Sequence, residues 1–131
     1  MKTAISARKG SRVSDEFSRQ YRLRSRDDFQ RVYEAETFAA DQCLVVCGCA
    51  NRLDFSRLGL SVSRKVGPAV LRNRWKRLIR EAFRRTRDQT APGLDLIVRP
   101  RAGASPDFRQ IAESLPKLAE QLARKRRRQR G

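Results

Sequence analysis

Apolar residues recur at two different spacings along the chain, and together they predict a protein of mixed helix and strand. In residues 25–36 the apolar side chains lie three and four positions apart behind Ser25, a residue suited to cap a helix N-terminus, so a short amphipathic helix is predicted. Residues 38–50 are mainly apolar and residues 58–63 alternate with a period of two, which predicts two strands. The polar residues 51–54 are predicted as the hairpin loop between them.

The second half of the chain predicts two further helices around one more strand. Pro68 stands at the favoured first position of a long helix that is predicted to run to about residue 89. Residues 94–98 are apolar enough for a strand, and residues 105–122 carry one apolar stripe at helical spacing. Pro116 is predicted to kink or split this last helix, because proline lacks the N–H donor and clashes with an earlier carbonyl. The order helix, strands, helix, strand, helix predicts one α+β sandwich in which helices cover a small sheet.

The length and the charge narrow the class of protein further. With 131 residues, of which 39% are hydrophobic, the chain is long enough for one small folded domain. Lysine and arginine number 31 against 14 acidic residues, which gives a net charge of +17 and argues for a polyanionic partner. The absence of histidine excludes His-based acid–base chemistry and argues against most zinc and non-haem iron sites.

No segment of the sequence predicts a membrane span or a secretory signal. The longest apolar run, residues 43–50, is far shorter than the ~20 residues of a transmembrane helix, and the first residues lack the apolar core of a signal peptide. Cys43, Cys47 and Cys49 are odd in number and closely spaced, which makes a poor disulfide framework and predicts a cytoplasmic protein. Their spacing places them on one face of a strand, where ordinary core packing is expected rather than a metal or redox site.

The excess charge is concentrated in residues 64–87 and 124–130, and the rest of the chain is nearly balanced. On a helical wheel, the long helix separates an apolar face from a nearly continuous basic face. Glu81 can pair with Arg77 or Arg85, but the other basic side chains repel one another until an anion neutralises them. Arginine binds phosphate bidentately, so this face is predicted to bind nucleic acid rather than to be a merely solvated surface. The apolar face comprises Leu71, Trp75, Leu78, Ile79, Ala82 and Phe83.

Three segments of the sequence are similar to a known family. Residues 59–67 (GLSVSRKVG) and 69–81 (AVLRNRWKRLIRE) closely resemble the signature of the bacterial ribonuclease P protein subunit, and residues 21–33 (YRLRSRDDFQRVY) resemble its start. The resemblance covers about residues 20–122. It implies a compact αβββαβα fold with a left-handed crossover around the basic helix, against the general preference for right-handed connections.

The resemblance also implies a function. The protein would join a large catalytic RNA and promote the removal of 5′ leaders from precursor tRNAs, so its expected partners are the catalytic RNA and precursor tRNA, with no DNA and no membrane. In this family the RNA carries the active site and its Mg²⁺ ions, and the protein contributes binding and positioning. The implied enzyme is ribonuclease P, with no catalytic residue and no metal ion held by the protein alone.

Individual residues match the family pattern in two places. Phe29 and Tyr33 match aromatic positions of the first helix, which borders the cleft for the single-stranded leader; core packing is the alternative for both, and is equally expected for Phe29. The family often supplies another aromatic residue from the following strand, and residues 43–49 contain none. The residues expected to contact the catalytic RNA are Arg64, Lys65, Arg72, Asn73, Arg74, Lys76, Arg77 and Arg80.

The chain is expected to have three parts. Residues 1–16 are predicted as a flexible basic extension, and residues 17–123 as an RNA-binding α+β domain. Residues 124–131 form a basic tail, which is expected to be either a mobile electrostatic tether or a structured contact.

Two other classes of function compete with ribonuclease P. A structural RNA-binding protein, such as a small ribosomal component, explains the charge but not the Arg-Asn-Arg segment at residues 72–74. A protein-only nuclease fits poorly because the acidic residues are scattered, with Asp54 and Asp95 lying singly. A helix-turn-helix DNA-binding factor also fits poorly, because no short helix precedes the long one at turn distance.

Overall fold

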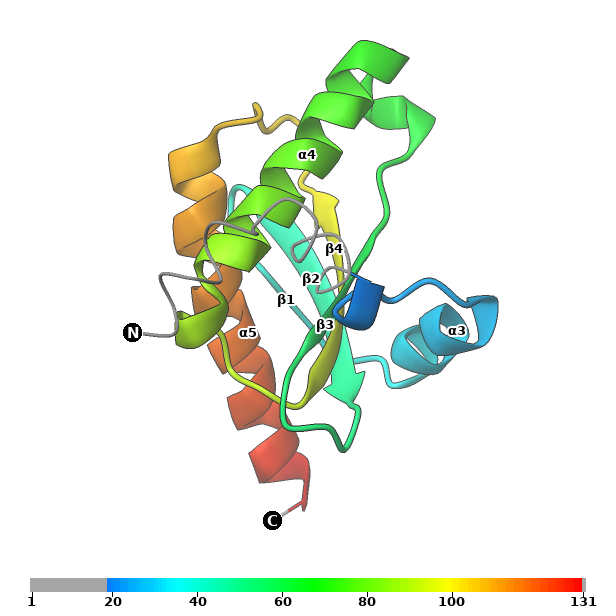
Figure 1. Cartoon of the computed structure of the whole chain (residues 1–131), viewed down its shortest axis with the longest axis vertical. Helices are drawn as coiled ribbons and strands as arrows, with labels where there is room; N and C mark the ends of the chain where they lie inside the picture. Colours follow the sequence, from blue (N-terminus) through cyan, green and yellow to red (C-terminus); the bar gives the residue numbers. More distant parts are fainter. Residues whose placement is uncertain (1–18, 131) are drawn as a thin grey trace, which may run out of the picture.

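The computed structural model describes residues 19–130, with side chains through residue 126, and its elements follow the predicted αβββαβα order (Figure 1). The predicted flexible extension of residues 1–16 lies outside the described residues. The elements are α3 (Arg26–Glu34), β1 (Phe38–Ala40), β2 (Leu44–Ala50), β3 (Arg57–Leu60), the 3-10 turn η1 (Arg64–Val66), α4 (Ala69–Arg85), the 3-10 turn η2 (Arg87–Gln89), β4 (Leu94–Pro100) and α5 (Phe108–Arg130).

The strands form one four-stranded mixed sheet in the order β1-β2-β4-β3. β2 pairs antiparallel with both β1 and β4, whereas β3 and β4 are parallel. The hairpin predicted at residues 51–54 is therefore wrong, because β4 lies between β2 and β3 and the loop passes across it. β4 takes an interior position, and its residues 94–98 are all buried because strands pair on both of its edges and helices cover both of its faces.

The segment predicted as the first strand forms both β1 and β2, because Asp41 turns the chain between them. Its Oδ1 accepts hydrogen bonds from the N–H groups of Cys43 and Leu44 at 2.8 and 2.9 Å. This turn also separates the cysteines, since Cys43 is buried in the larger core whereas Cys47 and Cys49 pack on the opposite face of the sheet. The prediction that all three share one face is wrong, because the regular alternation of β2 begins only after the turn.

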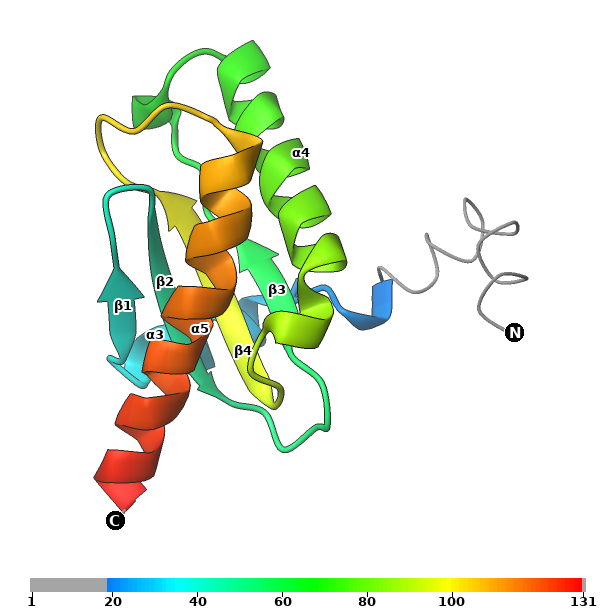
Figure 2. The same cartoon turned by 90° about the vertical axis from the view of Figure 1, so that its left-hand side faces the viewer.

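The connection from β3 through α4 to β4 is a left-handed crossover, as the family resemblance implies. In Figure 2 both strands point upward, α4 lies on the viewer's side of the sheet, and β4 lies to the left of β3. A right-handed connection with the helix in front would place the second strand to the right of the first. The resemblance therefore predicts the correct hand, and the general rule predicts the opposite one.

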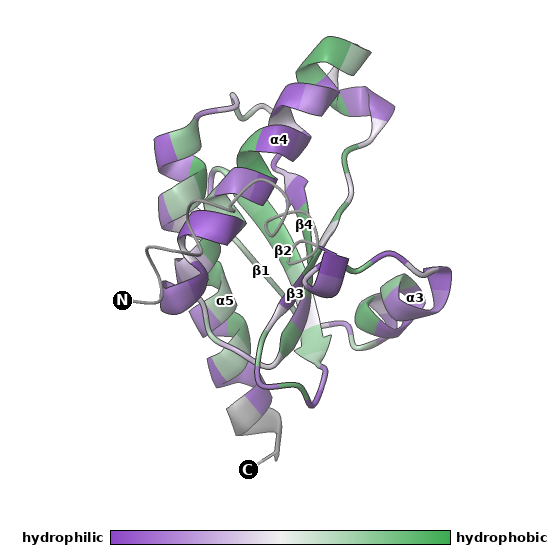
Figure 3. Cartoon of the chain, viewed as in Figure 1, coloured by the Kyte–Doolittle hydropathy of each residue, from purple (hydrophilic) through white to green (hydrophobic). Residues whose placement is uncertain are grey.

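α4 and α5 pack together on one face of the sheet, and α3 covers part of the other face (Figures 1 and 2). The amphipathic character predicted for the long helix is confirmed, because hydrophilic and hydrophobic residues alternate along its ribbon (Figure 3) and its buried residues are all apolar. Pro68 is the N-cap rather than the first helical residue, and α4 ends at Arg85 before the short turn η2. The buried residues of α4 are Trp75, Ile79, Ala82 and Phe83.

α5 runs through Pro116 as one helix, so the predicted split does not occur. Apolar side chains on both sides of the proline fill the core, and this packing offsets the missing backbone hydrogen bond. The basic residues 124–130 continue the same helix. Within residues 19–130, no helix combines the length and hydrophobicity that a membrane span requires. The core residues of α5 include Ile111, Leu115, Leu118 and Leu122, all fully buried.

The helix predicted to begin after Ser25 is α3, and its N-cap is confirmed. Ser25 Oγ accepts a hydrogen bond from the backbone N–H of Asp28 at 3.0 Å. On the side of α3 that faces the sheet, Val32 is fully buried and packs with Leu23 and Ile97 in a small second core. The capped helix is therefore held over the sheet by a narrow apolar contact.

We expect Trp75→Ala to lower the free energy of unfolding by about 3–5 kcal/mol, because this fully buried side chain leaves a cavity between α4 and the sheet. Urea unfolding followed by circular dichroism measures the change; fluorescence is unsuitable because the chain has a single tryptophan. Arg74→Ala on the exposed side of the same helix is the matched control, with an expected change within about 0.5 kcal/mol. Equal midpoints for the two variants would contradict the observed packing of α4.

Candidate nucleic-acid interface

The basic residues predicted to contact RNA lie on α4 and on the turn η1 that precedes it, where much of the ribbon is hydrophilic (Figure 3). Arg72 and Lys76 are half-buried, and the Nε of Arg72 donates a hydrogen bond to the carbonyl of Gly67 at 3.1 Å. This bond ties the first turn of α4 to the end of η1. The remaining predicted residues are exposed, although Arg80 is partly covered: Arg64, Lys65, Asn73, Arg74, Arg77 and Arg80.

The positive charge of this surface is largely uncompensated. Glu81 pairs with Arg84 at 2.5 Å and with Arg85 at 2.7 Å, so the predicted pairing with Arg85 is confirmed and the alternative with Arg77 is not observed. The hydrogen bond from Arg84, together with that from Arg85, holds the pKa of Glu81 below its usual value. The predicted RNA-contacting residues of α4 form no ion pair within the described part of the chain.

A groove of about 190 Å³ joins the basic helix to α3, and basic side chains surround it. Burial lowers the pKa of Arg80 at this groove, and the nearby charge of Arg22 lowers it further. A site in which a guanidinium is partly desolvated beside another cation favours an anion strongly, because the anion relieves the repulsion. The groove is lined by Arg22, Leu23, Arg24, Phe29, Leu58, Leu60, Lys76 and Arg80.

Sequence reasoning missed the two arginines that precede α3. Leu23 is buried and its N–H donates to the carbonyl of Leu58 at 2.8 Å, so the chain here runs beside β3. Arg22 and Arg24, the neighbours of Leu23, are exposed because side chains alternate along an extended segment. The alternation Arg-Leu-Arg is the signal that could have placed both arginines at the edge of the groove.

The aromatic residue Phe29 lies both at the small core and at the groove. It is half-buried and packs against the small core of Leu23, Val32 and Ile97, yet it also lines the groove. Its ring occupies the space that a side chain at Gly59 would need, since a Cβ built there would lie 2.8 Å from the Phe29 Cζ. The glycine of β3 therefore allows the ring to lie directly on the sheet.

Tyr33 is more accessible than Phe29, with 46% of its surface exposed. The two rings lie edge to face, with their centroids 6.4 Å apart. Both line a shallow cavity of about 490 Å³ on α3, together with Arg26, Gln30, Glu34 and Glu36. The structure thus brings together the two aromatic residues predicted from the sequence, and through Phe29 it joins them to Lys76 and Arg80.

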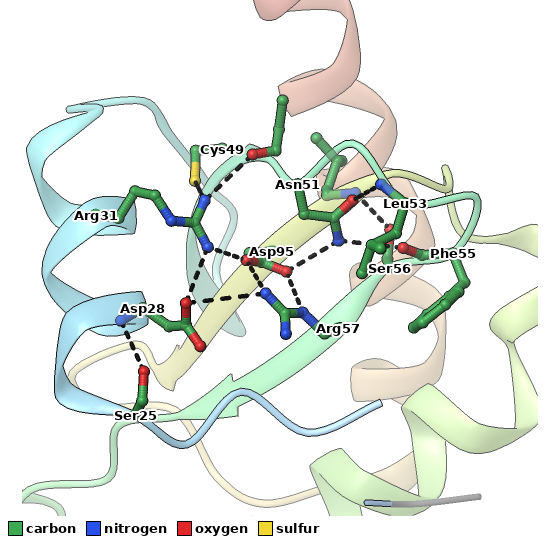
Figure 4. A network of polar contacts seen from close by, with 12 residues as sticks. Ser25, Asp28, Arg31, Cys49, Asn51, Leu53, Phe55, Ser56, Arg57 and Asp95 are labelled. Carbon is green, nitrogen blue, oxygen red and sulfur yellow. Dashed lines mark hydrogen bonds and ion pairs between the residues drawn. The ribbon is translucent and has the colours of Figure 1, made fainter. Parts of the chain in front are cut away.

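A buried carboxylate holds α3 in place against the sheet (Figure 4). Asp95 on β4 is fully buried, and it accepts hydrogen bonds from Arg57 Nε and Nη2 at 2.8 and 2.7 Å and from Asn51 Nδ2 at 2.9 Å. Arg31 of α3 donates to the same carboxylate and also to the carbonyl of Ala50 at 3.2 Å. The network therefore connects α3, the end of β2, β3 and β4.

The charge state of Asp95 follows from these contacts. Burial by itself would raise the pKa of Asp95, but the hydrogen bonds from Arg57, Asn51 and Arg31 outweigh it, and the pKa is lowered. Asp28 extends the network by pairing with Arg31 at 3.3 Å. Sequence reasoning treated Asp95 as an isolated acid, because its partners are distant in the sequence and no local pattern connects them.

Comparison with known proteins agrees with this geometry. The family model described as Ribonuclease P matches residues 17–123. The ribonuclease P protein component of Thermotoga petrophila is 38% identical over 99 residues, covering 76% of this chain and 85% of the relative. The ribonuclease P protein component of Clostridioides difficile is 37% identical over 107 residues, covering 80% of this chain and 94% of the relative. The solved ribonuclease P protein of Thermotoga maritima superimposes with a TM-score of 0.69 at 37% identity, covering 76% of this chain and 96% of that one.

The chain belongs to the ribonuclease P protein family. The resemblance predicted from the sequence is thereby confirmed, and so is the α+β fold that it implies. Membership makes this protein a component of ribonuclease P, the ribonucleoprotein enzyme of tRNA processing, rather than a ribosomal protein or a DNA-binding factor. The basic residues 124–130 lie beyond the matched segment, although they continue α5 without a break.

We expect Asp95→Asn to lower the free energy of unfolding by about 1.5–3 kcal/mol at neutral pH, because Arg31 and Arg57, which are partly exposed, lose charge-assisted hydrogen bonds to the buried carboxylate. Urea unfolding of both proteins measures the difference. Asp54→Asn, a change at an exposed acid of the nearby loop, is the matched control and leaves the stability unchanged.

The pH dependence of this difference has a definite sign. Since the folded state lowers the pKa of Asp95, the carboxylate stabilises the fold above its unfolded pKa and loses that contribution as the pH falls through the folded value. The two proteins should therefore converge in stability as the pH falls below about 4. A difference that persists undiminished in acid would show that Asp95 acts through its shape rather than its charge.

Proposed function

We propose that this protein binds the RNA subunit of ribonuclease P through the basic face of α4 and η1, and the 5′ leader of precursor tRNA through the α3 side of the sheet. It thereby promotes endonucleolytic removal of the leader in the cytoplasm. The observation that carries the proposal is the uncompensated basic surface of α4, which is continuous with an aromatic groove at Phe29.

The chemistry of α4 suits a structured RNA. Exposed arginines present planar forks that match phosphate oxygens, and their rigid spacing on one helix favours a fixed array of phosphates over a mobile acidic peptide. Binding also releases counterions, so affinity falls steeply with salt. A partly desolvated cation such as Arg80 gains more from a phosphate than a fully hydrated one does.

The chemistry of the α3 side suits a single strand. Phe29 and Tyr33 offer ring surface on which bases can stack whatever their sequence, while Lys76 and Arg80 stand at the same groove for the backbone. A single strand offers unpaired bases and a charged backbone, so stacking combined with charge is an appropriate mode of binding. The protein would hold the leader beside the RNA subunit and reduce the repulsion between the two RNAs.

Catalysis is assigned to the RNA subunit, which would also hold the Mg²⁺ ions. In support, Asp95 is the fully buried acid of the sheet, and its oxygens are already engaged by Arg31, Asn51 and Arg57. A carboxylate with these partners is not free to coordinate a metal ion. The role proposed for the protein is therefore binding and positioning.

Cleavage of precursor tRNA tests the proposal directly. At low Mg²⁺ we expect slow cleavage by the RNA subunit alone, none by the protein alone, and faster cleavage by the two together, because the protein supplies positive charge that Mg²⁺ supplies at higher concentration. Single-turnover assays of the three mixtures measure this. Cleavage by the isolated protein, or no acceleration on mixing, would refute the proposed role.

We expect Arg74→Ala to weaken assembly with the RNA subunit and to reduce the slope of log affinity against log salt by about 0.7–0.9 for the lost phosphate contact. Arg72→Ala should act in the same direction, although Arg72 also bonds to Gly67. Arg109→Ala, which removes an exposed arginine of α5, is the control. Filter binding at several salt concentrations gives the slopes, and identical slopes for the Arg74 and Arg109 variants would exclude α4 as the contact surface.

A further inference from the structure

Phe38 is an exposed aromatic residue that the function described so far does not use. It is the first residue of β1, which is an edge strand, and 56% of its surface is exposed. The edge of a sheet is a place where other molecules can attach. The Phe38 ring is therefore accessible to a binding partner.

The register of the sheet places Phe38 on the same face as α3. It pairs with Cys47 of β2, and residues directly opposite each other in an antiparallel pair point to the same face, with Cβ atoms about 4.5–5.5 Å apart. Cys47 packs with Ile97 and Phe29 in the small core beneath α3. Phe38 thus stands on the face that carries Phe29 and Tyr33, beside a β2 position that has no aromatic side chain.

The basic end of α5 reaches the same edge from the other side of the sheet. Lys125 Nζ donates a hydrogen bond to the carbonyl of Phe38 at 2.5 Å and lies 5.6 Å from the centre of the Phe38 ring. Arg126 is close enough to Cys49 for its positive charge to act on the thiol. Burial raises the pKa of Cys49, and the charge of Arg126 partly counteracts this rise. The aromatic ring and the cations come from segments far apart in the sequence.

We infer that Phe38 and Lys125 form a further binding subsite for the single-stranded leader, in which a base stacks on the Phe38 ring and a phosphate contacts Lys125. The inference rests on the proposed function. An aromatic ring beside a flexible cation is the pairing that binds single-stranded RNA without sequence preference. Phe38 would supply a ring from β1, and the basic end of α5 would extend the path of the leader beyond the α3 groove.

The test compares two precursor tRNAs, one with a long single-stranded leader and one with a leader of a single nucleotide. Binding is measured with the reconstituted protein–RNA holoenzyme. We expect Phe38→Ala to weaken binding of the long-leader substrate about 5- to 100-fold and to leave the short-leader substrate unchanged. Phe38→Trp should retain the affinity, whereas Phe38→Leu, which keeps apolar bulk without an aromatic face, should lose it.

Two further variants refine the interpretation. Lys125→Ala should weaken long-leader binding and reduce its salt dependence, whereas Leu53→Ala, a change at another exposed apolar residue, should alter neither. Thermal unfolding of each variant shows that the fold is intact. An unchanged affinity of the Phe38→Ala holoenzyme for the long leader would overturn the inference.

Equal losses for both substrates would also overturn it, because the side chain would then act on folding, on the RNA subunit or on a protein partner rather than on the leader. Failure of the proposed function has a different signature. In that case the wild-type holoenzyme itself would bind long-leader and short-leader substrates equally. Leader-dependent binding by the wild type that is lost in the Phe38→Ala variant supports both conclusions.

Discussion

The buried carboxylate of Asp95 is the interaction on which the arrangement of the α3 side depends. β2 and β3 do not pair with each other, and α3 touches the sheet through only a small apolar core. Asp95 joins these parts, because Arg31, Asn51 and Arg57 all donate to its two oxygens. A buried charge without those partners is strongly unfavourable. Placements of α3 that keep Arg31 beside Asp95 are therefore favoured over placements that separate the two side chains. The positions of Phe29 and Tyr33 follow from that placement.

The opposite constraint governs α4, where charge is left without partners. The helix is held by the burial of Trp75 and Ile79, which does not depend on the outward basic face. The arginines of this face repel one another in the folded protein. A bound polyanion would relieve this repulsion, and the relief would contribute to the binding free energy. The left-handed crossover places this helix beside the edge of β3, and residues 22–24 complete a groove from α4 to α3. The two surfaces recognised separately in the sequence are therefore one continuous surface.

The aromatic side chains on the α3 side of the sheet come from two elements. Phe29 and Tyr33 lie on α3, whereas Phe38 lies on β1 and stands across the strand pair from Cys47. Cross-strand neighbours occupy nearly the same place above a sheet, so Phe38 stands close to the small core beneath α3. Lys125 of α5 brings positive charge to the same edge. Elements far apart in the sequence therefore contribute to one face.

Local periodicity and capping were sufficient to predict the three helices and the two faces of α4, because these depend on residues within a few positions of one another. The family resemblance predicted the element order and the crossover, and it singled out the basic residues of α4 and, separately, Phe29 and Tyr33. The sequence alone did not predict the insertion of β4 between β2 and β3, the Asp95 network, or the meeting of Phe38 with Lys125. Each of these depends on residues separated by tens of positions, whose contact is decided by strand order and register. Those choices minimise buried polar groups and exposed apolar surface over the whole fold, so only the tertiary structure determines them.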